Sequence, residues 1–267
     1  MLLVKNYTSI KQSLYSQMVA ALGIYPKKEK FLHHPSTALI RLKNKGKCKL
    51  VYRSSLALRC ANAYGVGVRE IAGNLASHLA MDSDQKWQVQ VSELGWLEIE
   101  VMSELLAAWL QSWVDLVPVQ GNYFRDLGLT EMEFGVQYAH ARCCGLVRLG
   151  IGEGLISPVD SETRIPWWDY HLLYFQEPAE WDFLGNLIDA TDAIACLVDA
   201  SVERWQRYAL DVSRGFERFW AECNIFGATK IRNRQLAIAR LGLVIVCRRV
   251  LQELLEKKLN QPVIYYL

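Results

Sequence analysis

Residues 134–150 read Phe-Gly-Val-Gln-Tyr-Ala-His-Ala-Arg-Cys-Cys-Gly-Leu-Val-Arg-Leu-Gly, and this stretch decides how the second half of the chain is interpreted. Apolar residues recur at three- and four-residue spacing over 130–149, which predicts a helix. Tyr138 and Arg142 are four residues apart and therefore lie on one face of that helix. An aromatic ring can stack on an unpaired base, and a guanidinium can stack or pair with a phosphate.

Each polar residue of this helix has an alternative role. Tyr138 can pack against the terminal helix while Arg142 pairs with an acid. Gln137 can read a base edge or form a hydrogen bond within a helical bundle. His140 faces another side of the helix, and we interpret it as a polar helix residue rather than a catalytic base.

Working outward, the second half of the chain is predicted to be helical. Segments 130–149, 181–197, 200–222 and 231–258 carry apolar residues at helical spacing, which indicates a helical bundle. Residues 150–180, rich in Gly, Pro and aromatic residues, interrupt it. Pro118 and Gly121 mark the predicted linker at 116–124. We therefore predict two domains, 1–117 and 118–267.

The first half mixes helices and strand pairs. Helices are predicted over 6–22, 55–63 and 68–79, with Ser54 as a cap and Gly65 as a stop. Strand pairs are predicted over 39–52, turning near Asn44-Lys45-Gly46, and around Gly95. A further helix follows Ser103. This mixture predicts an α+β domain, so the whole chain is expected to be mainly α.

Charge is spread unevenly along the 267 residues, although the net charge is only +2. Residues 1–117 hold 14 basic and 9 acidic side chains, residues 118–229 hold 8 and 17, and residues 230–267 hold 8 and 2. The basic ends favour contact with nucleic acid, and the acidic middle disfavours it. The seven Cys are scattered without a Cys-x-x-Cys pair, so zinc ribbons and thioredoxin-like sites are excluded. With neither a long apolar run nor a signal sequence, we expect a cytoplasmic chain.

Sequence motifs of common enzymes are absent. The chain has no Gly-x-Ser-x-Gly, P-loop or His-Glu-x-x-His motif. Gly65-Val66-Gly67 lacks the rest of a dinucleotide fingerprint. Asp189 and Asp192, three residues apart on a predicted helix, are a weak candidate for a metal or acid–base pair. We therefore predict no catalytic residues, no metal, no cofactor and no small-molecule substrate.

Two sets of motifs resemble arginyl-tRNA synthetases. Residues 134–150, 216–225 (Phe-Glu-Arg-Phe-Trp-Ala-Glu-Cys-Asn-Ile) and 231–236 (Ile-Arg-Asn-Arg-Gln-Leu) are similar to the DALR anticodon-binding domain of those enzymes. Residues 54–58, 68–72 and 94–99 resemble their additional N-terminal domain. The resemblance implies that Tyr138 and Arg142 help to hold an anticodon loop. Gln235 stands where the family carries an Arg.

The catalytic domain of the family has no counterpart between these two parts. No His-x-Gly-His or Lys-x-Ser-Lys motif occurs, and fewer than about twenty residues separate the parts, whereas such a nucleotide-binding fold needs on the order of 100. The resemblance therefore implies a non-catalytic paralogue that binds tRNA or a tRNA-like RNA.

Basic residues near both ends extend this prediction. In the terminal helix, Arg232 and Arg234 belong to a stripe that either tracks an RNA backbone or is a solvated face. Tyr265 or Tyr266 could add stacking. Near the N-terminus, Arg41, Lys43, Lys45, Lys47 and Lys49 recur at every second residue, and the resemblance implies phosphate contact at the tRNA elbow. A charged sheet edge is the alternative.

A different function is indicated by the aromatic segment 166–183. Its acids repel phosphate, and exposed aromatic side chains tend to mark protein contacts. We therefore consider an adaptor or assembly factor that binds a protein partner through Trp167, Trp168 and Tyr170. The alternative is an aromatic lid that is buried on the bundle.

Overall fold

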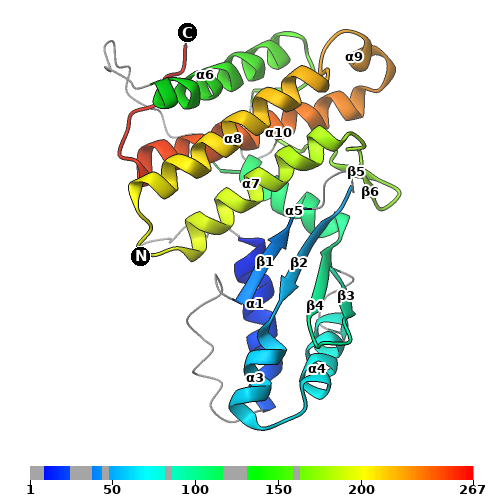
Figure 1. Cartoon of the computed structure of the whole chain (residues 1–267). Helices are drawn as coiled ribbons and strands as arrows, with labels where there is room; N and C mark the ends of the chain where they lie inside the picture. Colours follow the sequence, from blue (N-terminus) through cyan, green and yellow to red (C-terminus); the bar gives the residue numbers. More distant parts are fainter. Residues whose placement is uncertain are drawn as a thin grey trace, which may run out of the picture.

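The computed structural model of the chain describes residues 9–24, 38–43, 48–81, 86–116, 131–158 and 163–266. A small sheet with its helices forms one end of the molecule, and a bundle of long helices forms the other (Figure 1). The predicted mainly-α class is confirmed. No described helix combines the length and apolarity that crossing a membrane requires.

The sheet is antiparallel, with strand order β1-β2-β4-β3. Its strands are β1 (Leu39–Leu42), β2 (Leu50–Ser54), β3 (Trp87–Val91) and β4 (Leu97–Val101), and its helices are α1 (Ile10–Ala21, followed by the 3-10 turn η1, Leu22–Ile24), α3 (Leu56–Tyr64) and α4 (Val68–Met81). The alternating burial of β4 turns every second side chain into the core. Gly65 ends α3 in the left-handed conformation, with φ 68°, as a glycine stop predicts.

The bundle contains α6 (Glu131–Gly152), α7 (Pro178–Cys196), α8 (Val202–Glu222), the short α9 (Ala228–Arg232) and α10 (Arg234–Glu253), which continues into the turn η3 (Leu254–Lys258). The prediction of one helix over 231–258 was wrong at one point. Asn233, with φ −145°, separates α9 from α10, and its side chain accepts a hydrogen bond from the Leu236 N–H. An Asn cap therefore starts a new helix there.

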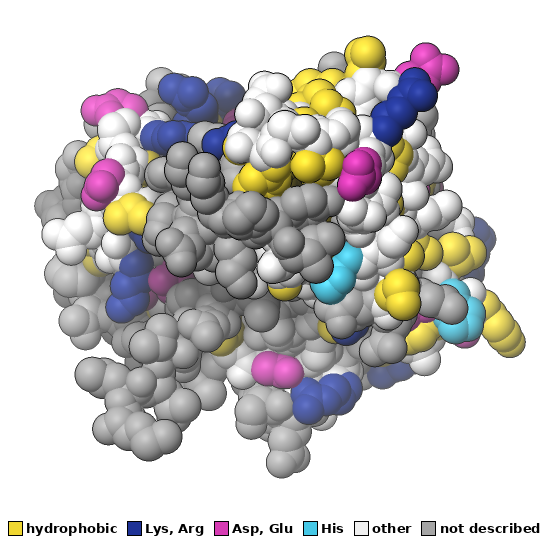
Figure 2. Space-filling view, turned by 90° about the horizontal axis from the view of Figure 1, so that it is seen from below, with side chains coloured by type: hydrophobic (Ala, Val, Ile, Leu, Met, Phe, Trp, Pro, Cys, Tyr) yellow, Lys and Arg dark blue, Asp and Glu magenta, His cyan; other side chains and the backbone are white. Residues whose placement is uncertain are grey.

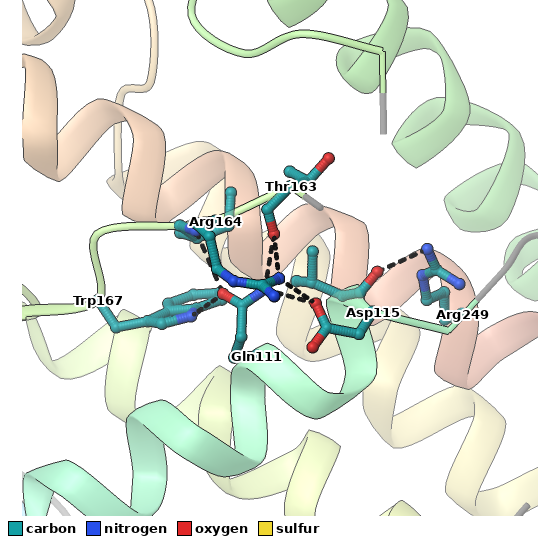
Figure 3. A network of polar contacts seen from close by, with 8 residues as sticks. Gln111, Asp115, Thr163, Arg164, Trp167 and Arg249 are labelled. Carbon is teal, nitrogen blue, oxygen red and sulfur yellow. Dashed lines mark hydrogen bonds and ion pairs between the residues drawn. The ribbon is translucent and has the colours of Figure 1, made fainter. Parts of the chain in front are cut away.

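The helix α5 (Ser103–Val114) joins the two ends of the molecule. It packs against α10 and against the short hairpin formed by β5 (Trp168–Asp169) and β6 (Leu172–Leu173). Gln111 donates to the Thr163 carbonyl at 2.7 Å and accepts from the Trp167 indole at 3.0 Å (Figure 3). Buried Arg249 of α10 donates to the Val114 carbonyl at 2.8 Å.

Buried apolar residues form one continuous cluster from Ile10 to Val263. The α+β part is therefore docked directly on the helical bundle. The predicted domain boundary at 117 lies outside the described residues, and the division 1–117 and 118–267 stays a prediction.

Candidate nucleic-acid interface

The helix α6 presents three faces, and the Gln-Tyr-Ala-His-Ala-Arg run is divided between them. One face, including Ala139 and Cys143, is buried against the bundle. Gln137 and His140 lie on a second face, which holds the C-terminal segment. Tyr138 and Arg142 lie half-buried on a third face, which also carries the exposed Phe134.

The second face binds the backbone of the C-terminal segment. Gln137 is 1 % exposed; its amide donates to the Pro262 carbonyl at 2.6 Å and accepts from the Ile264 N–H at 3.0 Å. His140 Nδ1 lies 2.8 Å from the Ile264 carbonyl, so this nitrogen donates. The Gln137 amide is engaged within the protein, and the prediction that it contacts RNA is therefore wrong.

His140 is fully buried, and burial lowers its pKa to about 4. The imidazole is neutral near pH 7 because a buried cation loses its hydration. Its ring meets the Tyr265 ring edge-on, with the centroids 5.3 Å apart. His140 is therefore a structural residue of the C-terminal segment, which agrees with the interpretation that it is not a catalytic base.

The third face carries a row of side chains in contact with one another. Arg142 Nη1 donates to the Tyr138 hydroxyl at 2.9 Å, and its guanidinium carbon lies 5.9 Å from the Tyr138 ring centroid and 5.2 Å from that of Trp220. The Phe134 ring, on a side chain that is 56 % exposed, lies 6.2 Å from the Tyr138 ring at 31°. These four residues are called the aromatic–arginine row below.

The aromatic–arginine row carries an uncompensated positive charge within the part of the chain that the structure describes. No carboxylate there forms an ion pair with Arg142. The predicted alternative, an acid partner for Arg142, is not found in those ranges. Of the four residues of the row, the sequence had pointed to Tyr138 and Arg142. Phe134 stands four residues before Tyr138 and could have been found from that spacing, whereas Trp220 comes from α8.

Arg148 extends the interface toward the C-terminal segment. Its guanidinium donates to the Tyr265 carbonyl at 3.2 and 3.3 Å and lies 4.2 Å from the centroid of the Tyr266 ring. Tyr266 is 56 % exposed. The Tyr265 hydroxyl accepts from Gln252 at 3.2 Å. Of the two tyrosines, Tyr266 is thus the one with the larger face open for stacking.

Arg232 and Arg234 do not join the aromatic–arginine row. Arg234 donates to the Gly154 carbonyl at 2.5 Å, at the C-terminal end of α6, and Arg232 is exposed nearby on α9. Twelve residues of chain separate Gly154 from Arg142, about 18 Å at 1.5 Å per helical residue. Any RNA contact by Arg232 and Arg234 would therefore be made apart from the aromatic–arginine row, and it stays a prediction.

The predicted N-terminal basic patch is only partly described. Lys43 is exposed at the end of β1, but Lys45 and Lys47 lie outside the described residues. Arg41 forms a bidentate ion pair with Asp189 of α7, and its side chain is 12 % exposed. An added Cβ at Gly185 would lie 2.8 Å from Arg41 Nη1. Arg41 therefore serves the contact between sheet and bundle, which corrects its prediction as a free phosphate ligand.

The pair Asp189 and Asp192 has a role that the sequence did not predict. Asp192, 5 % exposed on α7, accepts from the Ser9 hydroxyl at 2.6 Å, from the Lys11 N–H at 3.1 Å and from the Tyr52 hydroxyl. Burial raises its pKa to about 6. The two carboxylates, one helical turn apart, bind α1, β1 and β2 to the bundle.

The aromatic segment divides into an anchor and a tip. Trp167 is 3 % exposed and lies against Gly242 of α10, where an added Cβ would lie 2.5 Å from its ring. Its prediction as a protein-binding residue is therefore wrong. Trp168 and Tyr170 are 39 % and 89 % exposed.

The face of the molecule seen from below shows Lys and Arg side chains gathered at the upper left and hydrophobic side chains protruding at the right (Figure 2).

Metal ligands are not grouped in the described ranges, where no three His, Cys, Asp or Glu side chains could hold an ion.

Comparison with known proteins finds a family match in the helical half of the chain. Residues 136–257, from α6 to the turn after α10, match the DALR anticodon binding domain. The similarity to this domain is confined to the helical half of the chain. Tyr138, Arg142 and Trp220 of the aromatic–arginine row lie within the matched residues of the DALR domain, and Phe134 lies two residues before them.

Curated relatives agree over the same half. The chain is 31 % identical over 122 residues to an arginine–tRNA ligase of Moorella thermoacetica, covering 45 % of this chain and 20 % of the ligase. It is 33 % identical over 121 residues to that of Chlorobaculum parvum, with 45 % and 20 % covered, and 31 % identical over 134 residues to that of Gloeobacter violaceus, with 47 % and 22 % covered. The chain thus spans about a fifth of these relatives. No solved structure matches it.

Proposed function

We propose that the exposed face of α6 binds an unpaired loop of a tRNA or tRNA-like RNA. The observation that carries this proposal is the aromatic–arginine row, where Arg142 lies between two rings without an ion-pair partner in the described residues. Aromatic faces stack on unpaired bases, and an uncompensated guanidinium attracts phosphate. The likeness to arginine–tRNA ligases supports an arginine tRNA as the first ligand to test.

The test is a fluorescence-anisotropy titration with an arginine tRNA transcript. Because stacking contributes about 1–3 kcal/mol per base, Tyr138→Ala should weaken binding roughly 5- to 150-fold. Tyr138→Phe keeps the ring and should stay near the wild type. Arg142→Gln removes the charge of the row. Its control is Arg207→Gln, which removes the charge of an exposed Arg on α8. Equal affinities for wild type and Tyr138→Ala, with unchanged melting temperatures, would sink this proposal.

We further propose that the chain does not itself aminoacylate tRNA. The His-x-Gly-His and Lys-x-Ser-Lys motifs of arginyl-tRNA synthetases are absent from all 267 residues. In addition, α1 and β2 bind α7 directly through Asp192, so the two parts are in contact rather than separated by a third domain. Incubation with ATP, arginine and the transcript should form no arginyl ester. Ester formation that persists after removal of any contaminating ligase would overturn this proposal.

The hairpin β5–β6 supports a second candidate function, contact with a protein partner. Tyr170 and His171 have φ of 46° and 66°, a conformation that costs residues other than Gly roughly 1–2 kcal/mol each. His171 is fixed by Glu104 at 2.7 Å, and Trp167 anchors the base of the hairpin. Tyr170 and Leu172 are exposed beside Asp169, so the fitting partner has an apolar pocket with a basic rim.

Photo-crosslinking tests this second candidate. A photoreactive residue at position 170 should capture one partner in stoichiometric amount, and the same residue at exposed Leu94 should not. Equal capture at both positions, or capture of RNA alone, would remove the protein-contact function.

A further inference from the structure

A polar cleft lies between the sheet and the bundle. Two adjoining hollows of about 230 and 290 Å³ lie between the end of β1 and the helices α7 and α8. They share Arg41, Lys43 and Asn186. Seven Lys or Arg and four Asp line them together. This cleft between sheet and bundle is therefore basic, although the segment that supplies α7 and α8 is acidic.

One face of α8 supplies the far wall of the cleft. Arg204, Asp211, Arg214 and Arg218 follow one another at intervals of seven, three and four residues, so they lie on the same side of the helix. All four line the hollows. Close packing of α7 on α8 sets the position of this wall, because an added Cβ at Gly215 would lie 2.5 Å from the Asn186 amide.

The cations of the cleft differ in how far they are already neutralised. Arg41 pairs with Asp189, Arg218 with Asp182 and Glu222, and Lys49 with Glu100. These pairs fix the walls.

Three further cations remain available. Lys43, Arg204 and Arg214 are exposed and have no ion-pair or hydrogen-bond partner within the ranges that the structure describes. Arg204 and Arg214 are ten residues apart, about 15 Å along the helix. This spacing favours a ligand with several phosphate groups over a single small anion. In the sequence, Lys43 is followed by Lys45 and Lys47.

We propose that this cleft binds the phosphodiester backbone of RNA, through Lys43 on one wall and Arg204 and Arg214 on the other. The site is distinct from the aromatic–arginine row and contributes charge rather than stacking. Because the ligand is taken to be the RNA that the α6 face binds, this inference rests on the proposed function. Trp181 also lines the second hollow and offers an aromatic edge or face beside the backbone.

The test is the salt dependence of binding to the arginine tRNA transcript. The slope of log K against log salt is negative, and each lost phosphate contact reduces its magnitude by about 0.7 to 0.9. K43Q/R204Q/R214Q should therefore reduce the magnitude by about 2 to 3. A change of 2 in the slope corresponds to a loss of affinity on the order of 100-fold at 100 mM salt, relative to 1 M salt. The control R69Q/R207Q/K257Q removes the same charge from exposed positions outside the cleft and should keep the wild-type slope.

The outcomes separate the two proposals. If Tyr138→Ala weakens binding while the cleft variant keeps the wild-type slope, the cleft inference is wrong and the proposed function stands. If the cleft variant loses slope while Tyr138→Ala binds normally, the cleft is supported and the α6 site is wrong. Absence of wild-type binding would overturn both. Polyglutamate and poly(U) RNA of equal charge are then compared as competitors of the transcript. If polyglutamate competes as strongly as poly(U), the cleft binds acidic protein and the proposal of an RNA ligand is wrong.

Discussion

Replacing Asp192 by Asn should change how stability depends on pH, because this buried carboxyl joins the sheet to the bundle. Burial raises its pKa to about 6 from the ordinary 3.8. The folded chain therefore holds the proton more tightly than the unfolded chain. The contribution of the protonated group is fully present below pH 3.8 and is lost as the pH rises through 6. A difference of two pKa units corresponds to about 3 kcal/mol.

The assay is urea unfolding of wild type and Asp192→Asn between pH 4 and pH 8. The free energy of unfolding of the wild type, minus that of the variant, should fall by about 2 kcal/mol between pH 4 and pH 6.5 and then change little. Asp199→Asn removes a carboxylate from an exposed position and is the matched control. A difference between wild type and Asp192→Asn that stays constant over this range would refute the reasoning, whatever its absolute size.

Three further changes test buried contacts of the helical half. The pKa of His140 is about 4 in the folded chain, so the stability that the neutral imidazole contributes is present above pH 6.5 and is lost as the pH falls through 4. Urea unfolding of the wild type should show this as a loss of about 3 kcal/mol in the free energy of unfolding, and His140→Gln should not show it. Gly242→Ala should cost about 1–3 kcal/mol in thermal unfolding, because its Cβ would overlap the Trp167 ring. Glu180→Gln, which breaks the buried ion pair with Arg240 at 2.6 Å, should cost about 3–5 kcal/mol by urea unfolding.

The changes at Gly242 and Glu180 have matched controls. Gly73 lies in α4 with nothing within 4 Å of an added Cβ, so Gly73→Ala should stabilise the chain by about 0.5–1 kcal/mol. An equal loss at Gly73 and Gly242 would contradict the overlap argument. Recovery of stability in the double variant Glu180→Leu/Arg240→Met would show that the single change acts by leaving a buried cation unpaired.

Local elements of the fold could be predicted from the sequence because their signals are local. The strand pair around Gly95 and the stop of α3 at Gly65 follow from side-chain alternation and from the left-handed φ that glycine tolerates. The break at Asn233 was missed because apolar periodicity continues on both sides of it. Only the cap geometry, in which Asn233 bonds the Leu236 N–H, reveals that break.

Contacts between distant segments could not be predicted in this way. Two partners of Asp192, Ser9 and Lys11, are 183 and 181 residues away in the chain, and no periodicity relates Ser9 to α7. For the same reason the motif around Tyr138 indicated the right helix but not Trp220, which packs beside Arg142 from another helix. Gln137 and Arg41 were assigned to RNA because the sequence shows polar side chains without showing what already binds them.

The division of labour within the Gln-Tyr-Ala-His-Ala-Arg run has an evolutionary consequence. Gln137 and His140 face the C-terminal segment and are constrained by folding, whereas Tyr138 and Arg142 are half-buried and make no contact with that segment in the hydrogen bonds and ring contacts described above. Selection for stability alone would preserve the first pair and let the second drift. Among descendants of the same ancestor, the relative substitution rates of these two pairs would therefore record whether RNA recognition is still under selection.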